Sequence, residues 1–251
     1  MMSKVKSLLV VWKNKKNNQY YHVGTLSYNS KEYIFEYTYH SNAPRKVYEA
    51  LDDGYFLHPA FPELKKKYIS KKLFSAFDRR VPSDSRINYY ELLDEMGLPS
   101  NADRMDLLKE TRGFLPGDPY TFELPLRIEG QILQTNFYVN GMRHEKNLPE
   151  NWPDNVYLGQ KLELILDKEN DVDPNAVKIY SSETPLGYVP AIYAQAVSSL
   201  LKRGIQVSLT VKNISPNWAP QWWLRVELSA QIEELSKEEL KRTLDDLQVV
   251  A

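Results

Sequence analysis

The sequence contains no cysteine, and this absence removes several classes of function. Without a thiol the chain has no disulfide scaffold, no thiolate zinc site and no cysteine nucleophile. The absence also suits a reducing compartment, so we expect a cytoplasmic protein. Long apolar runs are missing too: the run near the N-terminus covers only Leu8–Trp12, whereas a membrane span needs ~20 apolar residues and a signal peptide needs a longer apolar core. We therefore expect no membrane association.

Sequence motifs that mark enzymes are also absent. The four histidines do not stand at metal-ligand spacing, and neither a phosphate-binding glycine loop nor a serine nucleophile elbow occurs. Carboxylates are plentiful, but a pair indicates acid–base chemistry only in a pocket that a sequence does not show. We expect a non-catalytic protein that has no cofactor and no resident metal ion.

The sequence also lacks an excess of charge of either sign, because its 32 Lys and Arg residues are balanced by 33 Asp and Glu residues. No segment has the basic excess that a protein coating nucleic acid by counterion release would need. Any nucleic acid is then held locally, through few phosphates. The densest basic stretch, "KKKYISKK" at residues 65–72, has two interpretations. It is the solvated face of an amphipathic helix, or it is a face for phosphates or an acidic partner.

The first half of the chain predicts a β-hairpin followed by short helices. The runs "HVGTLSY" and "EYIFEYTY" flank a turn at Asn29–Ser30, as in a hairpin. Helical signals then follow at residues 62–77 and at residues 88–97, where Asn88 is a candidate N-cap and Gly97 ends the pattern. A third helix is expected at residues 101–113. Residues 1–125 are therefore expected to form an α+β domain.

The second half predicts many short strands around one helix. Strand patterns recur in "GQKLELILD", "AVKIY", "LGYV", "IQVSLTV" and "WWLRVELSA", and the helix begins after Pro190 and ends at Gly204. This pattern favours a small OB-like or SH3-like β-barrel over residues 126–232. Residues 233–251 contain a capping box of Ser236 with Glu239 and predict a C-terminal helix. The fold class expected for the whole chain is α+β.

Asn and Asp residues are concentrated in "DKENDVDPNAVKIY", residues 167–180, directly before one of these strands. Turn chemistry alone explains such a cluster, because Asx-rich turns before strands are common and Asp-Pro signals a turn. The alternative is that Asn170 and Asp173 line a turn that faces a ligand. Composition does not decide between the two interpretations.

Three motifs in the second half, taken in order, resemble the HIRAN domain. They are "GMRH" at residues 141–144, "ENDVDPNAVKI" at residues 169–179 and "LGYVP" at residues 186–190, immediately before the helix. The resemblance covers about residues 130–230. It implies an OB-like barrel that binds single-stranded DNA and has a pocket for the free 3′-hydroxyl end. The family occurs alone in bacteria and fused to helicases in eukaryotes, so the resemblance implies a bacterial protein.

The same resemblance implies a role for particular residues. Arg143 would hold a backbone phosphate, His144 would stack where eukaryotic members have Tyr, and Asp173 would accept a hydrogen bond from the 3′-hydroxyl. Val172 departs from the family, which has an aromatic residue before that Asp. The predicted DNA-binding residues are Arg143, His144, Asn170, Asp173, Lys178, Tyr188, Trp218 and Trp222.

The first half resembles the N-terminal subdomain of HipA-type toxin kinases. Gly24 and Leu26 match its hairpin motif, and Phe77, Arg80 and Pro82 match its F-x-x-R-x-P segment. The sequence leaves no room for the kinase body, so we expect residues 1–125 to dock a protein partner, such as a kinase, helicase or nuclease. The alternative function is then a regulatory component of a toxin–antitoxin or phage-defence system that does not bind DNA directly.

Overall fold

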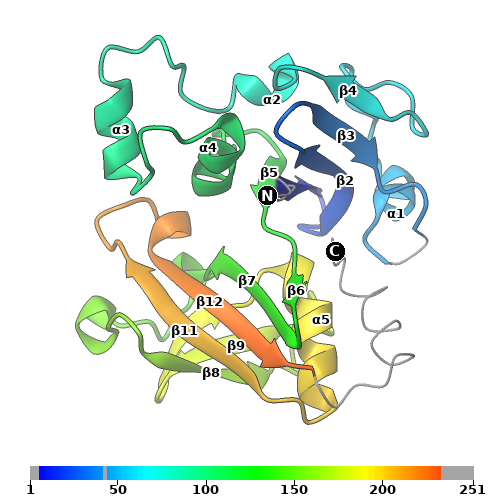
Figure 1. Ribbon diagram of the computed structural model, residues 1–251. Helices are drawn as coiled ribbons and strands as arrows, with labels where there is room; N and C mark the ends of the chain where they lie inside the picture. The colour runs from blue at the N-terminus through cyan, green and yellow to red at the C-terminus, as the bar shows by residue number, and fades with distance from the viewer. Residues whose placement is uncertain (1–5, 42–43, 233–251) are drawn as a thin grey trace. The chain divides into compact units, whose positions relative to one another are not determined.

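The computed structural model describes residues 6–41 and 44–232 (Figure 1). The chain divides between Leu124 and Pro125 into two compact units, which are described separately. None of the helices in the described residues is long and apolar enough to cross a membrane. The helix predicted at residues 233–251 lies outside the described part of the chain.

Unit 1, residues 1–124, is built on a five-stranded antiparallel sheet in the order β4-β3-β2-β1-β5. Strands β2 and β3 form the predicted hairpin. Its turn is fixed because Asn29 Oδ1 accepts hydrogen bonds from the backbone N–H groups of Lys31 at 3.0 Å and Glu32 at 2.8 Å. The hairpin prediction is therefore confirmed. The strands are β1 (Lys6–Lys13), β2 (Tyr20–Tyr28), β3 (Tyr33–Tyr37), β4 (Tyr68–Ser70) and β5 (Tyr120–Glu123).

The helix predicted at residues 62–77 is wrong. The structure has the edge strand β4 and the short helix α2 in its place. Two contacts outweigh the helical spacing: β4 pairs with β3, and the Phe61 ring packs 5.1 Å from that of Tyr68 and 5.2 Å from that of Phe74. The lysines of residues 65–72 thus flank an edge strand, where Lys discourages pairing with other chains. The helices of unit 1 are α1 (Val47–Asp52), α2 (Ser75–Asp78), α3 (Tyr89–Glu95) and α4 (Arg104–Thr111).

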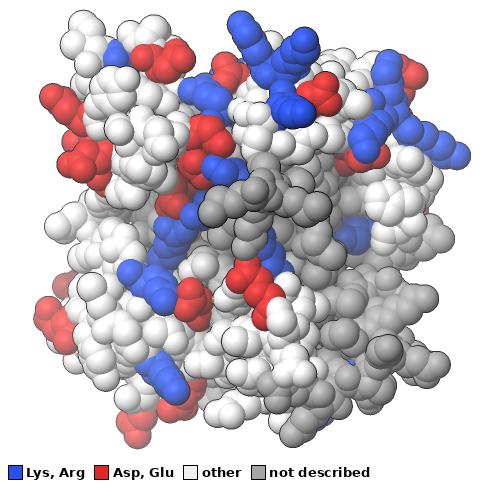
Figure 2. All heavy atoms as spheres, viewed as in Figure 1, with Lys and Arg blue, Asp and Glu red and all other residues white. Residues whose placement is uncertain are grey.

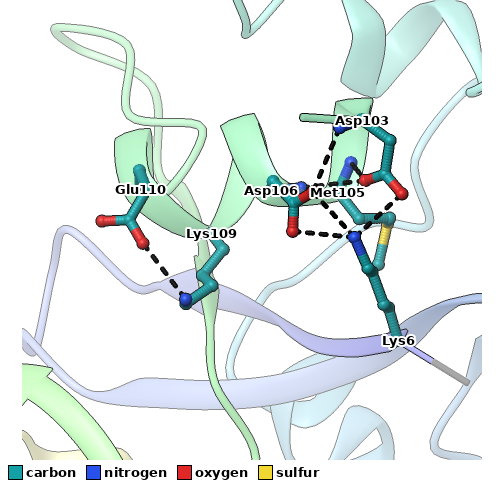
Figure 3. Close-up of polar contacts among 6 residues, drawn as sticks. All are labelled: Lys6, Asp103, Met105, Asp106, Lys109 and Glu110. Atoms are coloured by element: carbon teal, nitrogen blue, oxygen red, sulfur yellow. Dashed lines mark hydrogen bonds and ion pairs between the residues drawn. The ribbon is translucent and has the colours of Figure 1, made fainter. Parts of the chain in front are cut away.

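Lys6 of β1 ties the sheet to the start of α4 (Figure 3). Asp103 caps this helix by accepting the backbone N–H groups of Met105 at 2.9 Å and Asp106 at 3.1 Å, and Asp106 Oδ2 accepts that of Asp103 at 3.1 Å. Lys6 Nζ donates to Asp103 Oδ2 at 2.9 Å and to Asp106 Oδ2 at 2.7 Å. Burial opposes ionisation of Asp106, but the hydrogen bonds from Lys6 and the Asp103 backbone, together with the charge of Lys6, outweigh it and hold the pKa of this carboxyl below its ordinary value. The cap of this helix, Asp103, thus lies two residues after Asn101, where the helix was predicted to begin.

The described part of unit 2 is a curled antiparallel sheet, a half-barrel of seven strands in the order β10-β9-β8-β11-β12-β7-β6. Its closure into an OB-like or SH3-like barrel stays a prediction. The strands are β6 (Arg127–Glu129), β7 (Ile132–Tyr138), β8 (Lys161–Leu166), β9 (Val177–Ser181), β10 (Thr184–Tyr188), β11 (Val207–Ile214) and β12 (Leu224–Gln231). Three short 3-10 helices join them: η1 (Met142–His144), η2 (Trp152–Asn155) and η3 (Pro220–Trp222).

Helix α5 (Ala191–Lys202) lies against one face of this sheet (Figure 1). It begins after Pro190 and ends before Gly204, which has a φ of +74°, so the prediction for this helix is confirmed. Side chains of a strand alternate between the two faces of the sheet, and alternate residues of β7 are buried accordingly. On the buried face, the ring of Phe137 stacks on Tyr193 of α5, with centroids 5.5 Å apart. The buried face fixes the register of β7 and, with it, the place where η1 begins.

Candidate nucleic-acid interface

Gly187 allows the backbone before η1 to pair closely with the end of β10. The backbone N–H of Tyr188 donates to the Asn140 carbonyl at 2.8 Å, and the N–H of Asn140 donates to the Tyr188 carbonyl at 2.9 Å. Gly187 has a φ of +140°, and a Cβ at this position would lie 2.5 Å from the Asn140 oxygen. Only glycine fits here without a backbone shift. The joint places the short helix that carries Arg143 beside the ring of Tyr188.

Arg143 and His144 are both exposed on η1. Arg143 Nε donates to His144 Nε2 at 3.1 Å, which orients the two side chains together. This bond uses one of the five N–H donors of the guanidinium. The planar fork formed by the other donors suits a phosphate. The structure therefore brings together these two predicted site residues.

Lys178 of β9 pairs with Glu145, a residue that sequence reasoning did not single out. Its Nζ forms an ion pair with Glu145 Oε2 at 3.0 Å, and the two side chains are 20% and 8% exposed. The same Nζ lies 5.6 Å from the ring centroid of Tyr188. Burial opposes the charge on Lys178, but the hydrogen bond and the negative charge of Glu145 together outweigh it and raise the pKa of the amine. Lys178 is thus a cation whose charge is balanced locally.

The side chains of Asn170 and Asp173 build the turn that precedes β9. Asn170 Oδ1 accepts the backbone N–H groups of Val172 at 3.1 Å and Asp173 at 2.9 Å. Asp173 Oδ1 accepts the N–H of Asn175 at 2.9 Å, and Asp173 is only 8% exposed. Turn chemistry is therefore confirmed at both residues. A role for either in facing a ligand stays a prediction.

Asp167, directly after β8, is a second residue that sequence reasoning missed. Its Oδ2 accepts a hydrogen bond from Tyr188 Oη at 2.8 Å and one from Asn170 Nδ2 at 3.2 Å. Burial opposes ionisation, but these bonds outweigh it and hold the pKa of Asp167 below its ordinary value. Burial and the adjacent Asp167 raise the pKa of Tyr188. The signal for Asp167 was its place at the first position of the Asx-rich stretch.

The tryptophans lie in and before η3, which contacts η1. Trp222 meets the ring of Tyr138 edge-on, with centroids 4.9 Å apart and an interplanar angle of 89°. Trp218 is 55% exposed, and its carbonyl accepts the indole N–H of Trp223 at 2.9 Å. The loop is therefore fixed by its own side chains, and it presents aromatic surface of the kind that stacks nucleic-acid bases.

The described residues, 6–41 and 44–232, include no group of three or more His, Asp or Glu side chains that could hold a metal ion. In the acidic turn the carboxylates are instead hydrogen-bonded to N–H and hydroxyl donors, as at Asp167 and Asp173.

Comparison with known proteins gives one family match. The family model of the HIRAN domain matches residues 132–233. A crystal structure of the HIRAN domain of human HLTF is 18% identical, with a TM-score of 0.36, over 48% of this chain and 93% of that chain. A crystal structure of a Lactobacillus plantarum protein is 19% identical, with a TM-score of 0.34, over 38% of this chain and 89% of that chain. No curated protein matches the sequence.

The family match falls on the half of the chain that carries the three sequence motifs, so that resemblance is confirmed. The resemblance of residues 1–125 to the HipA subdomain stays a prediction. The chain therefore contains a HIRAN domain at residues 132–233.

Proposed function

We propose that unit 2 is a non-catalytic DNA-binding module that holds the 3′ end of a single strand. HIRAN domains are nucleic-acid-binding domains, which supports the ligand class. One observation carries the location: Lys178 and Asp167 both contact Tyr188, whose backbone pairs with Asn140 just before η1, the short helix that carries Arg143. We call Arg143, His144, Asp167, Lys178 and Tyr188 the Tyr188 cluster.

The charges of the Tyr188 cluster suit a strand end better than the middle of a strand. Arg143 supplies a fork for a phosphate, whereas Asp167 and Asp173 supply acceptors that attract a hydroxyl and repel a phosphate. Acidic and basic side chains are interspersed on the face of the molecule shown in Figure 2. Because Lys178 is already paired with Glu145 and Arg143 is the cation offered to a phosphate, binding would neutralise few phosphates, and affinity would depend only weakly on salt, with a slope of roughly −1 to −2 in log–log form.

The loop around η3 supplies the base-stacking surface in this proposal. Trp218 is exposed, and Trp222 is braced by Tyr138. Stacking on such rings is worth about 1–3 kcal/mol per base and tolerates any base. His144, exposed beside Arg143, adds a smaller planar surface.

Fluorescence anisotropy with short labelled single strands ending in a 3′-hydroxyl or a 3′-phosphate, each at two salt concentrations, tests the proposal. We expect tighter binding of the hydroxyl-ended strand. Arg143→Gln should weaken binding by about 1–2 kcal/mol, whereas Lys202→Gln, an exposed charge change at the end of α5, should leave it unchanged. Equal affinity for the two strands, or equal affinity of wild type and Arg143→Gln, would contradict the proposal.

A second candidate function, protein docking through unit 1, is favoured by exposed apolar side chains there. Phe56 is 84% exposed, Tyr90 69%, and Ile87 fully exposed. Such side chains mark interaction sites when they gather in a patch. A partner kinase, helicase or nuclease would co-purify in stoichiometric amounts with wild type and be lost from an Ile87→Ser, Tyr90→Ser double variant. Retention of the same partner by the double variant would contradict docking at these residues.

A further inference from the structure

The strand β4 is an open edge of the unit 1 sheet and is surrounded by lysines. Among the described strands it pairs with β3 alone, so its other side presents backbone N–H and C=O groups to solvent. Figure 2 shows basic side chains on the part of unit 1 where Figure 1 places β4. Five exposed lysines flank the strand, three before it and two after it: Lys65, Lys66, Lys67, Lys71 and Lys72.

Side chains of β4 itself hold the two basic flanks in place. Tyr68 Oη accepts the backbone N–H of Glu63 at 2.7 Å and donates to the Glu63 carbonyl at 3.3 Å. At the other end, Ser70 Oγ donates to the Lys72 carbonyl at 2.6 Å and accepts the N–H of Lys72 at 3.2 Å. The backbone that carries the lysines is therefore fixed relative to the strand.

Most of the positive charge around β4 is not balanced. Two of the five lysines have carboxylate partners: Lys66 Nζ lies 2.6 Å from Glu63 Oε1, and Lys67 Nζ lies 3.4 Å from Glu36 Oε2. Such solvent-exposed pairs are worth only about 0–1 kcal/mol, so another carboxylate can replace them. The other three lysines form no ion pair with any described residue. The edge therefore attracts an acidic partner.

The centre of the edge is apolar. Ile69 is 53% exposed and lies opposite Ile34 of β3 in the strand register. Residues directly opposite each other share one face of a sheet, so the two isoleucines form an apolar spot between the lysine flanks. A phosphate backbone gains nothing from this spot, and nucleic acid is typically bound by guanidinium forks and stacked rings. The combination suits a peptide better than a nucleic acid.

We propose that β4 is a docking edge for an acidic, extended segment of a protein partner, which adds to the unit 1 sheet as a further strand. In such additions the backbone bonds supply affinity and the side chains supply specificity. Carboxylates near both ends of the segment would meet the lysines, and an apolar side chain between them would cover Ile69. The same lysines repel a second copy of β4, so they select an acidic strand and oppose self-pairing.

Anisotropy of a fluorescein-labelled peptide, EEVIVEE, titrated with the full chain tests the proposal. The control peptide KKVIVKK reverses the charge. The control peptide EEPPPEE keeps the charge but has no N–H group at its three central positions, so it cannot pair as a strand. We expect EEVIVEE to bind and each control to bind at least about tenfold more weakly.

Variants of the chain locate the binding. The double variant Lys71→Gln, Lys72→Gln keeps most of both side chains and removes two charges, and it should weaken binding of EEVIVEE about five- to tenfold. The matched control Lys16→Gln, Lys202→Gln removes two exposed charges, one from the turn between β1 and β2 and one from α5. This control should keep the wild-type affinity.

Equal binding of EEVIVEE and EEPPPEE would reveal attraction by charge without strand addition and overturn the proposal, as would binding of neither peptide. If Lys71→Gln, Lys72→Gln weakened binding of a single-stranded oligonucleotide but not of the peptide, the lysines would belong to a nucleic-acid surface instead. A wild-type dimer that Ile69→Lys dissociates would assign the edge to a second copy of the chain. Failure of unit 2 to bind DNA ends leaves the proposal intact, because the peptide assay does not involve the Tyr188 cluster.

Discussion

The two units each contain a pair of aspartates near the start or end of an element, and the pairs are neutralised differently. In unit 1, Asp103 and Asp106 at the start of α4 share the ammonium group of Lys6 (Figure 3). In unit 2, Asp167 and Asp173 receive hydrogen bonds from neutral donors: a tyrosine hydroxyl, an asparagine amide and backbone N–H groups. The nearby cation Lys178 is paired with Glu145 instead.

This difference separates a structural cluster from a candidate binding cluster. Lys6 offsets one of the two negative charges of the unit 1 pair, so that pair has less charge left with which to attract a ligand. Neutral donors orient the unit 2 carboxylates without cancelling their charge. The unit 2 pair therefore keeps its negative charge, which the proposed recognition of a strand end requires.

Gly187→Ala gives the largest expected effect, because it breaks the joint on which the unit 2 cluster depends. The new Cβ would meet the Asn140 oxygen at 2.5 Å, and the φ of +140° strains any other residue. We expect a loss of about 2–4 kcal/mol in the free energy of unfolding, measured by urea denaturation. Gly159→Ala is the control, because its φ of +81° strains alanine too but a Cβ there meets nothing within 4 Å. Equal losses in the two variants would show that contact with Asn140 is not what makes Gly187 necessary.

Asp173→Ala tests how far the stability of the unit 2 turn depends on its buried carboxylate. Removing this buried turn carboxylate leaves the Asn175 N–H without its partner, so we expect unfolding to become easier by about 1–2 kcal/mol. Asp171→Ala, at an exposed position of the same turn, should change stability by less than about 0.5 kcal/mol. Thermal and urea unfolding of both variants provide the check; an unaffected Asp173→Ala protein would mean that the turn does not depend on its carboxylate.

Lys6→Met tests the structural assignment of the unit 1 pair. Both side chains of the Lys6–Asp106 pair are partly exposed, so with solvent screening the expected loss at pH 7 is only about 1 kcal/mol. The pKa of Asp106 is lowered in the fold. Its stabilising contribution is therefore present above the unfolded-state pKa, about 4, and is lost as the pH falls through the lower folded-state value.

The difference in stability between wild type and Lys6→Met should consequently shrink toward zero as the pH is lowered from 7 to 2. Urea denaturation across that range measures it. A difference that is the same at every pH would show that Lys6 contributes by packing alone, and the comparison between the two aspartate pairs would lose its basis.

Glu145→Gln gives the smallest expected effect and acts in the opposite direction. Glu145 balances the charge of Lys178, so removing it frees a cation near the proposed phosphate position. We expect single-stranded DNA to bind about two- to threefold more tightly at low salt, with a steeper salt dependence. Anisotropy titrations at two salt concentrations measure this change. Weaker binding by the variant would indicate that the ion pair is needed to position η1.

The sequence predicted those features that depend on neighbours along the chain. The hairpin at Asn29–Ser30, helix α5 between Pro190 and Gly204, and the Asx turn at residues 170–175 are all set by local turn and capping chemistry. The three ordered motifs also located the HIRAN domain.

Features set by distant partners could not be predicted in the same way. The segment at residues 62–77 had helical spacing, but pairing with β3 made part of it a strand. Glu145 and Asp167 were missed because their partners, Lys178 and Tyr188, lie on other strands of the curled sheet. That Asp173 is buried in its turn whereas Asp167 is half-buried also depends on that curl.

Hydrogen exchange of the full chain, with and without an excess of a short 3′-hydroxyl single strand, tests the central claim most directly. Backbone amides report local opening, and a ligand that binds one cluster slows exchange there. We predict slower exchange in residues 140–145 and 167–176 of unit 2, and no change in unit 1 around Asp103 and Asp106. Protection confined to unit 1, or none at a strand concentration that saturates binding, would contradict the assignment of the nucleic-acid interface to the Tyr188 cluster.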